Sequence, residues 1–463
     1  MTPCSFIFKK IRVCMPSRVP LVAKQLRCAT RALSRPRPLR DKNANDEEPF
    51  GSTKQSSGAR KHGDKMPVAA RAAPAPAAMK DEYGAMDADG ETFTVDAYAL
   101  ESGIRLVRPQ VRYRTYGAFN AQRDNCVVVC HALTGNAALD SWWGDMLGPG
   151  KLFDTQRYLI VCLNVLGSCY GTTGPTSINP ATGLRYGASF PDVTVRDSVG
   201  LHILAVRDGI KARSVLAVIG GSLGGMQALE WAAMAGSYVK TVIAMCCGAS
   251  HSPWQIGISE TQRQAIYADA KWRGGDYPPD DGPASGLSVA RQVAMITYRS
   301  HQAYLEKFGR ELVADEPAGH GQERFHDVER YLRHQGVKFP ARFDALSYVK
   351  LTRLMDTHDV GRGRGGVARA LQSLQQPTLV LSVSSDALYP PEEQEQLARG
   401  LPHVEYRVIA SNAGHDGFLL EQALVEFFSK SFLRRFAPVV ELPSVCAGDQ
   451  QHKQQQQQQR AML

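Results

Sequence analysis

One serine of this chain stands in a setting that can turn a hydroxyl into a nucleophile. Ser222 lies between Gly220 and Gly224, after the apolar, β-branched residues 214–219 and before the helix-like residues 225–231. This pattern predicts a sharp turn from a strand into a helix, which strains the serine backbone and lifts its side chain above the sheet. A Cβ at either glycine would collide in such a turn. Ser222 is therefore the candidate nucleophile.

A serine hydroxyl needs a base within hydrogen-bonding reach, and a third group must orient that base. In a fold built on such an elbow, the acid and then the histidine follow the serine along the chain, each on a loop after a strand. Asp386 follows the apolar residues 379–383, and His415 stands in the glycine loop 411–418. Alone, each would be interpreted as a loop or capping residue. Their order and spacing after Ser222 favour a triad in which His415 transfers the proton and Asp386 orients it.

An acyl transfer also needs N–H donors for the oxyanion of the tetrahedral intermediate, each worth about 3 kcal/mol when removed. In this kind of fold one donor is the backbone N–H after the nucleophile, here Leu223. The other comes from a loop after an early strand, here residues 131–135, and we assign it to Leu133. His131, at the strand end, is expected to be structural rather than a base.

The elements that must position these residues alternate along the chain. Apolar, strand-like runs are separated by helical stretches, which favours a mostly parallel α/β sheet with helices on both faces. The expected strands are residues 107–116, 126–130, 158–163, 215–219, 242–246, 378–383 and 404–409. Residues 420–436 have apolar positions at helical spacing and are expected to form the closing helix.

The alternation stops between residues 252 and 375, a segment too long for a loop. Its polar helical stretches are expected at Glu260–Ala270, Val289–Phe308 and Phe325–Gln335. We interpret 252–375 as a helical lid inserted into a core made of residues 92–251 and 376–440.

Within the lid, Gly361–Gly366 matches the spacing of a dinucleotide-binding fingerprint, G-x-G-x-x-G. The residues before it, 351–359, are typical of a helix rather than a strand. No sheet edge therefore presents a helix terminus to a pyrophosphate, and a basic glycine loop near the site entrance is the favoured interpretation.

The net charge of +9 comes from one end of the chain. Residues 1–40 hold ten Lys and Arg and no Asp or Glu, so the rest carries about −1 and a nucleic-acid partner loses its support. This basic segment has no apolar run long enough for a membrane span, and we expect an organelle transit peptide, mitochondrial or plastid. A basic disordered extension, with a cytoplasmic protein, is the alternative. Residues 41–91 are expected to be a disordered linker, and 441–463 a Gln-rich disordered tail.

The ten cysteines show neither metal-ligand spacing nor a disulfide framework. A reducing compartment is the simpler interpretation, and no metal site is expected. Cys169 stands in the glycine loop 167–171, but no neighbouring charge would stabilise its thiolate.

Several segments together are more specific than the elbow alone. They resemble homoserine O-acetyltransferases over about residues 93–436, and this likeness implies the α/β-hydrolase fold with an inserted helical lid. The segments that carry the resemblance are residues 131–136, 164–177, 190–197, 220–229, 262–266, 342–344 and 414–421.

The resemblance implies a two-step transfer. Ser222 takes the acetyl group from acetyl-CoA and passes it to the γ-hydroxyl of L-homoserine, with CoA as a substrate rather than a bound cofactor. The family's amino-acid-binding pair falls on Arg291, for the α-carboxylate, and on Asp416, for the α-ammonium. Such a forked cation and an anion suit a zwitterionic acceptor. We expect a homodimer, although no residue pattern in the chain sets the oligomeric state.

Other interpretations remain open from the sequence. The loop 167–174 and the segment 137–143 depart from many relatives beside the acyl site. They leave open succinyl rather than acetyl transfer, and serine rather than homoserine as acceptor. An esterase-like hydrolase would let water resolve the acyl-enzyme, and a non-catalytic binding protein on the same fold is disfavoured by the intact triad.

Overall fold

The computed structural model of the chain describes residues 90–314 and 324–437. Their centre is an eight-stranded sheet in which the strand β1 pairs antiparallel with β4, β4 pairs antiparallel with β6, and all later pairs are parallel. In spatial order the strands are β1 (Glu91–Thr94), β4 (Gln110–Gly117), β6 (Leu159–Leu163), β5 (Cys126–Cys130), β7 (Val215–Gly221), β8 (Val239–Met245), β11 (Thr378–Val383) and β12 (Val404–Ile409). The α/β-hydrolase arrangement expected from the sequence is therefore present.

The register of the parallel strands brings their carboxyl ends to one edge. Cys130 at the end of β5 pairs with Gly220 of β7, and Gly221 pairs with Met245 of β8. Val383 of β11 pairs with Ile409 of β12. The loops that carry the candidate site residues consequently leave the sheet at the same edge, as expected for a ligand site in an open parallel sheet.

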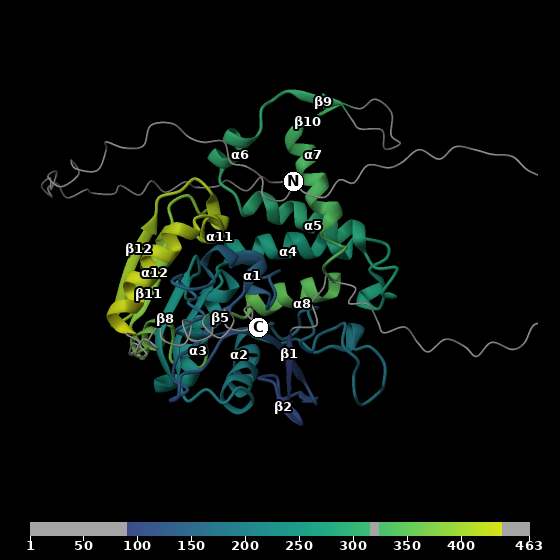
Figure 1. The fold of residues 1–463 in the computed structure, drawn as a ribbon. Helices are drawn as coiled ribbons and strands as arrows, with labels where there is room; N and C mark the ends of the chain where they lie inside the picture. Colours follow the sequence, from purple (N-terminus) through teal and green to yellow (C-terminus); the bar gives the residue numbers. More distant parts are fainter. Residues whose placement is uncertain (1–89, 315–323, 438–463) are drawn as a thin grey trace, which may run out of the picture. The chain divides into compact units, whose positions relative to one another are not determined.

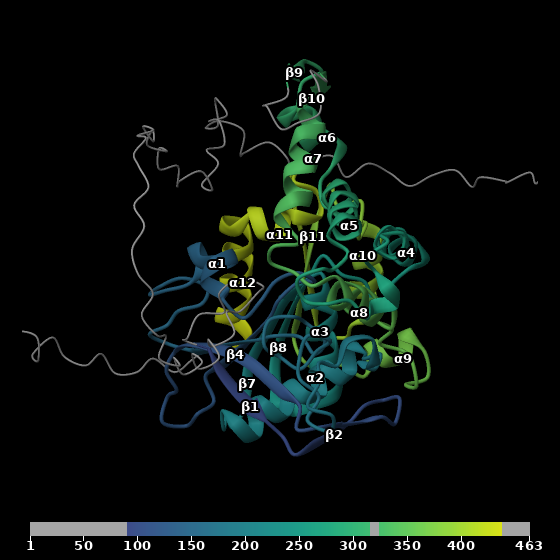
Figure 2. The ribbon, with the colours of Figure 1, turned by 90° about the vertical axis from the view of Figure 1, so that its right-hand side faces the viewer.

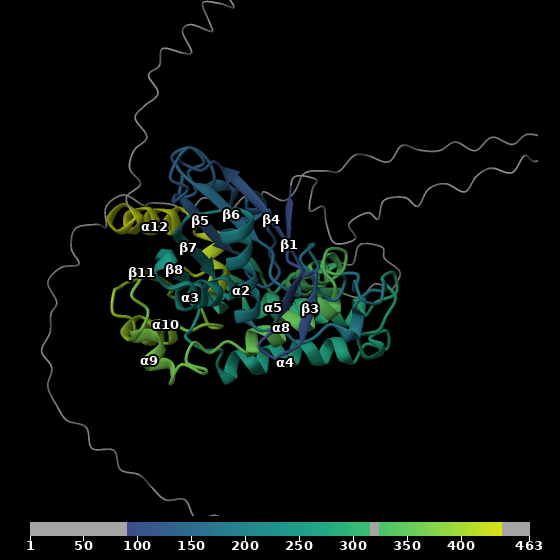
Figure 3. The same cartoon turned by 90° about the horizontal axis from the view of Figure 1, so that it is seen from below.

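Two apolar layers cover the two faces of the sheet, because its central strands are buried on both sides. One layer contains α2 (Val195–Leu204), α3 (Leu223–Ala235), α9 (Val367–Gln372) and α10 (Pro391–Gly400). The other contains α1 (Leu139–Trp143) and the closing helix α12 (Gln422–Phe436). Figure 3 shows α12 on one side of the sheet and α3 and α10 on the other.

The segment between β8 and β11 forms the inserted lid. Figures 1 and 2 show α4, α5 and α7 beyond the sheet edge, on the side where the short helix α11 (Gly417–Leu420) lies. The lid contains α4 (Pro253–Tyr267), α5 (Ala284–Thr297), α6 (His301–Lys307), β9 (Leu312–Ala314), β10 (Arg324–His326), α7 (Asp327–Lys338) and α8 (Ala345–Asp356). A second small pair, β2 (Ala97–Ala99) with β3 (Arg105–Val107), lies outside the main sheet.

Three details of the lid differ from the sequence expectation. The helix expected over Glu260–Ala270 begins seven residues earlier, at Pro253, and ends at Tyr267. The single helix expected over Val289–Phe308 is two helices, because α5 ends at Thr297 and Ser300 caps the start of α6 by accepting a hydrogen bond from the Ala303 N–H at 3.0 Å. The helix expected from Phe325 begins at Asp327, since Phe325 belongs to the unpredicted hairpin of β9 and β10.

The glycine loop Gly361–Gly366 follows α8 and not a strand of the sheet. Its arginines are used in ion pairs: Arg362 with Glu101 at 2.7 Å and Arg364 with the buried Glu230 at 2.7 Å. The loop therefore fastens the end of the lid to the core.

The terminal expectations fall mostly outside the described residues. This holds for the transit peptide over 1–40, the tail over 441–463 and almost all of the linker over 41–91, although Glu91 already belongs to β1. Within the described residues, no helix is both long and apolar enough to cross a membrane.

Candidate active site

The elbow between β7 and α3 holds Ser222 in a strained backbone conformation, with φ 59° and ψ −124°. A Cβ at Gly220 would stand 2.3 Å from the carbonyl oxygen of Gly224, and a Cβ at Gly224 would stand 2.1 Å from the carbonyl oxygen of Cys130. Both neighbours are backbone atoms, so they cannot turn aside as a side chain could. The glycines are required for the turn to close.

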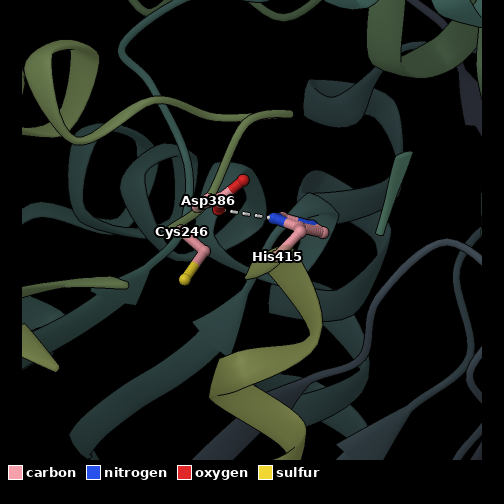
Figure 4. A group of neighbouring side chains, drawn as sticks. All are labelled: Cys246, Asp386 and His415. Carbon is pink, nitrogen blue, oxygen red and sulfur yellow. Dashed lines mark hydrogen bonds and ion pairs between the residues drawn. The ribbon is translucent and has the colours of Figure 1, made fainter. Parts of the chain in front are cut away.

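Asp386 and His415 meet at the same edge. Nδ1 of His415 donates to Oδ2 of Asp386 at 2.8 Å (Figure 4), and both residues are 3% exposed. The other carboxylate oxygen accepts backbone N–H bonds from Leu388 at 2.9 Å and Tyr389 at 2.8 Å. With its carboxylate fixed in this way, Asp386 leaves Nε2 of His415 available for proton transfer.

Ser222 completes the candidate triad by position but not by a hydrogen bond. Among the hydrogen bonds of residues 90–314 and 324–437, none joins Ser222 to His415, and the serine side chain does not cap α3. In substrate-free sites such catalytic contacts are often long and tighten only in the reacting complex. Ser222 is 6% exposed and follows β7, the strand adjacent to β8.

The two expected oxyanion donors lie on segments that are joined to each other. Leu223 is the first residue of α3, where backbone N–H groups have no helical acceptor. The amide of the buried Gln227 donates to the carbonyl oxygens of Leu223 at 3.3 Å and His131 at 3.2 Å. These two bonds of Gln227 link the start of α3 to the loop that carries Leu133.

His131 holds that loop and is not placed to act as a base. Its Nδ1 lies 2.8 Å from the carbonyl oxygen of Ala132, and its Nε2 accepts from the Val165 N–H at 3.2 Å. Burial lowers the pKa of His131 to about 4, so the ring is neutral. Both nitrogens are engaged, in agreement with the structural role expected from the sequence.

Arg291 and Asp416, the pair expected to bind the amino-acid acceptor, form no direct ion pair with each other among the described residues. Asp416 pairs directly with Arg299, whose Nε lies 3.0 Å from Oδ2 as an ion pair without an aligned hydrogen bond. Arg291 lies against the rings of Phe339, at 5.0 Å, and Tyr298, at 5.9 Å. Asp416 is therefore already paired with a cation, Arg299, which was not predicted from the sequence.

Electrostatics nevertheless connect Arg291 with Asp416. Burial raises the pKa of Asp416 above the usual range of an Asp, while its electrostatic interactions with Arg299, His415 and Arg291 oppose this rise. Arg291 is thus close enough for its charge to act on the carboxylate. A sequence signal that could have pointed to Arg299 is Ser300, a residue type that favours a helix start; it caps α6 and leaves Arg299 in the break between the two helices.

Three aromatic rings surround His415, and sequence reasoning missed all of them. The ring centroids of Tyr389, Phe418 and Tyr298 lie 5.1, 5.5 and 6.0 Å from that of the imidazole. The backbone N–H of Asp416 also donates to the carbonyl oxygen of Tyr298 at 3.0 Å. The last turn of α5 is therefore fastened to the histidine loop.

Arg342 joins the lid to the oxyanion loop. Its Nη1 donates to the carbonyl oxygen of Thr134 at 3.1 Å and to the hydroxyl of Tyr170 at 3.0 Å, and that hydroxyl donates to the carbonyl of Arg342 at 2.9 Å. The sequence marked Arg342 only as part of a family-like segment. Its bonds give it a role in fixing the loop of Leu133.

Cys246 lies close to the acid and the histidine, with its sulfur and their ligand atoms all within 4.8 Å of one another (Figure 4). Burial raises the pKa of this thiol well above its usual range, and Nδ1 of His415 is already bonded to Asp386. A metal would need a thiolate and a free imidazole nitrogen, so we assign no metal to this group. Burial likewise raises the pKa of the Cys169 thiol, which removes the case for a reactive cysteine there.

Comparison with known proteins places these features in a family. Residues 125–422 match the model of the alpha/beta hydrolase fold family. The homoserine O-acetyltransferase of Chlorobium chlorochromatii is 48% identical over 341 residues, which cover 73% of this chain and 94% of that protein. The chain belongs to the homoserine O-acetyltransferase family.

Solved structures agree with this membership. The crystal structure of homoserine O-acetyltransferase from Bacillus anthracis superposes with a TM-score of 0.69 at 25% identity, covering 76% of this chain and 99% of that one. Esterase E22 superposes as well, with a TM-score of 0.68 at 24% identity over 74% of this chain and 99% of that one. The second likeness shows the fold alone, so the family assignment depends on the sequence relatives.

Proposed function

We propose that this protein transfers an acetyl group from acetyl-CoA to the γ-hydroxyl of L-homoserine, giving O-acetyl-L-homoserine for methionine biosynthesis. Its membership of the family supports the reaction. The site supports the chemistry through the strained elbow at Ser222 and the 2.8 Å bond between His415 and Asp386. Acetyl-CoA is consumed as a substrate, and the proposed steps use no bound cofactor.

In the first step, His415 removes the proton of Ser222 as the hydroxyl oxygen attacks the thioester carbonyl. The N–H groups of Leu223 and Leu133 stabilise the oxyanion, and Asp386 stabilises the imidazolium. The carbon–sulfur bond then breaks, and the CoA thiol leaves with the proton returned by His415. The acetyl group remains on the serine.

In the second step, the γ-hydroxyl of homoserine gives its proton to His415 and attacks the acetyl-serine. The same two N–H groups hold the new oxyanion. The bond to the serine oxygen breaks, and His415 returns the proton to Ser222. The enzyme is regenerated, and one acetyl ester has replaced one thioester.

The observation that carries the choice of acceptor is the carboxylate of Asp416, directly after His415 and within the electrostatic reach of Arg291. The side chain of Asp416 is 17% exposed and pairs with Arg299, and Arg291 acts on it electrostatically, so charges of both signs stand beside the base. The α-ammonium of an amino acid fits Asp416, and its α-carboxylate fits Arg291. A simple ester would use neither charge.

The decisive experiment measures CoA release by the purified protein with acetyl-CoA and L-homoserine. Release that depends on homoserine is the expected result. L-Serine in place of homoserine and succinyl-CoA in place of acetyl-CoA test the two neighbouring specificities in the same assay. Acetyl-CoA or 4-nitrophenyl acetate turned over at the same rate without any amino acid would instead indicate a hydrolase and contradict the proposal.

We also propose that the protein is a homodimer that associates through its lid. Val289 and Ile296 on α5 and Val337 on α7 are 48%, 52% and 74% exposed, which is unusual for so many large apolar residues on two neighbouring helices. Light scattering coupled to gel filtration should give twice the chain mass. A monomer at micromolar concentration would contradict the dimer.

The basic segment 1–40 supports an organelle location, mitochondrial or plastid. A fluorescent protein fused after residue 91 should enter one of these organelles, and the same fusion without residues 1–40 should stay in the cytoplasm. Equal cytoplasmic distribution of the two fusions would favour the alternative of a basic extension without a targeting role.

A further inference from the structure

A second histidine lies behind the catalytic one, and the proposed mechanism does not use it. The ring of Tyr389 faces that of His415, with centroids 5.1 Å apart and planes tilted by 30°. The Tyr389 hydroxyl lies 3.1 Å from Nδ1 of His251, in the loop after β8. Nε2 of His251 lies 3.8 Å from Oδ1 of Asp356, the last residue of α8. A line of side-chain contacts therefore runs from the lid to His415.

The hydrogen-bond donors of Tyr389 and His251 determine which atom donates at each step of this line. Tyr389 is completely buried, so its hydroxyl proton needs an acceptor, and Nδ1 of His251 lies within reach. His251 must then carry its own proton on Nε2, the nitrogen that faces the carboxylate of Asp356. Burial, together with the positive charges of His358 and Arg263, lowers the pKa of His251 to about 3, so the ring is neutral.

Both ends of the line are held in place. At the lid end, Nη2 of Arg263 on α4 lies 2.8 Å from Oδ2 of Asp356, and the arginine side chain is 1% exposed. At the catalytic end, the backbone N–H of Tyr389 donates to Asp386 at 2.8 Å while its ring packs on His415. Tyr389 thus contacts both the acid and the base of the triad.

We propose that Asp356, His251 and Tyr389 form a positioning relay, which fixes the ring of His415 and ties its orientation to the lid helices α4 and α8. None of the three needs to touch a substrate. Their effect is on the direction of Nε2 of His415, and a misplacement of about 1 Å can cost about a hundredfold in rate. The proposal rests on the assignment of His415 as the general base.

The test begins with Tyr389→Phe, which keeps the ring against His415 and removes only the hydroxyl. The relay predicts that kcat falls about tenfold in both half-reactions while both KM values stay the same, because proton transfer and not binding is affected. The matched control is Tyr238→Phe. This change also removes a tyrosine hydroxyl that donates a part-buried hydrogen bond, to the carbonyl oxygen of Ala212 at 2.8 Å, but Tyr238 lies at the opposite end of the sheet strands. Wild-type kcat in Tyr389→Phe with only a lower Tm would overturn the relay.

Two changes at His251 separate its roles. His251→Leu removes the acceptor for Tyr389 and should lower kcat as Tyr389→Phe does. His251→Asn can offer an oxygen to the tyrosine and should recover part of that loss. Equal kcat in the two variants would contradict a role through the hydroxyl. His415→Ala is the reference: if it keeps transfer activity, the general-base assignment fails, whereas an inactive His415→Ala beside an unimpaired Tyr389→Phe rejects the relay alone.

The tautomer of His251 gives a readout that packing alone does not set. The full chain labelled with ¹⁵N-histidine, with His251→Asn used to assign the signal, should show His251 protonated on Nε2 at neutral pH. A proton on Nδ1 would reverse the bond to Tyr389 and reject the proposed direction.

Discussion

Two regions of the site are fixed by different physical means: the elbow around Ser222, and the group formed by Asp416, Arg299 and Arg291, here called the acceptor corner. At the elbow, Gly220 and Gly224 pack against backbone carbonyls at distances that leave no room for a Cβ, so close backbone packing fixes Ser222. At the acceptor corner, Asp416 is held by an ion pair with Arg299 and by the nearby charge of Arg291. Side chains of that kind can be rearranged or replaced.

This difference has a functional consequence. The chemistry of acyl transfer is the same for any acceptor, and it is built into the least adjustable part of the molecule. In the function proposed above, the choice of acceptor depends on charges carried by the lid helix α5 and by the His415 loop, which can change without disturbing the elbow. Changes at the elbow should therefore abolish all activity, while changes at the corner should affect only the second half-reaction.

The largest effect is expected for Ser222→Ala. Removing the nucleophile should lower kcat by about 10⁴-fold or more, because no acetyl-enzyme can form. Mass spectrometry of the wild-type protein mixed with acetyl-CoA alone should show an acetyl group on the peptide that contains Ser222. An acetyl group on another residue, or a variant that still releases CoA in response to homoserine, would refute the assigned nucleophile.

Gly224→Ala should have the next largest effect, because it destabilises the fold around Ser222 rather than removing a reacting group. The new Cβ would stand 2.1 Å from the carbonyl oxygen of Cys130, and overpacking of this kind costs at least about 1–3 kcal/mol. Gly257→Ala is the control, since this glycine lies in α4 with nothing within 4 Å and alanine there should stabilise the helix by about 0.5–1 kcal/mol. Thermal unfolding compares the two, and an unchanged Tm in Gly224→Ala would contradict the close packing.

The two regions also differ in how far the sequence predicted them. Seven of the eight strands of the main sheet, the placement of Ser222 and the bond between Asp386 and His415 followed from apolar runs and from the fixed order of an elbow-type fold; β1 was missed. Such features depend on local backbone geometry and on topology, which a single sequence expresses directly.

The acceptor corner was predicted only in part, because its contacts join segments far apart in the chain. Arg299 and Asp416 are brought together by the break before Ser300, and a pattern extended through residues 289–308 hides that break. The ring of Tyr389 reaches His415 through the turn after Asp386. No periodicity along the chain records such side-chain contacts.

A smaller and more selective effect is expected for Asp416→Asn. The amide keeps the shape of the carboxylate but loses the charge that would bind the α-ammonium, and such charged hydrogen bonds contribute about 1.5–3 kcal/mol. The kcat/KM for homoserine should fall about 10- to 100-fold, while the rate of acetyl-enzyme formation changes little. Stopped-flow detection of CoA release measures the first half-reaction alone, and equal losses in both halves would argue against a role in acceptor binding.

The pH dependence of homoserine use gives the finest test of the corner. Asp416 must be ionised to bind an ammonium group, and burial raises its pKa, so activity with homoserine should decline on the acid side at higher pH than an ordinary Asp would allow. Arg299 opposes that rise. Arg299→Gln should therefore move the acid limb of kcat/KM for homoserine to still higher pH, with less than about a tenfold loss at the optimum.

The control is the pH profile of acetyl-enzyme formation, which should not move, since that step does not use Asp416. A limb that shifts equally in both half-reactions would mean that Arg299 acts on the triad rather than on the acceptor site.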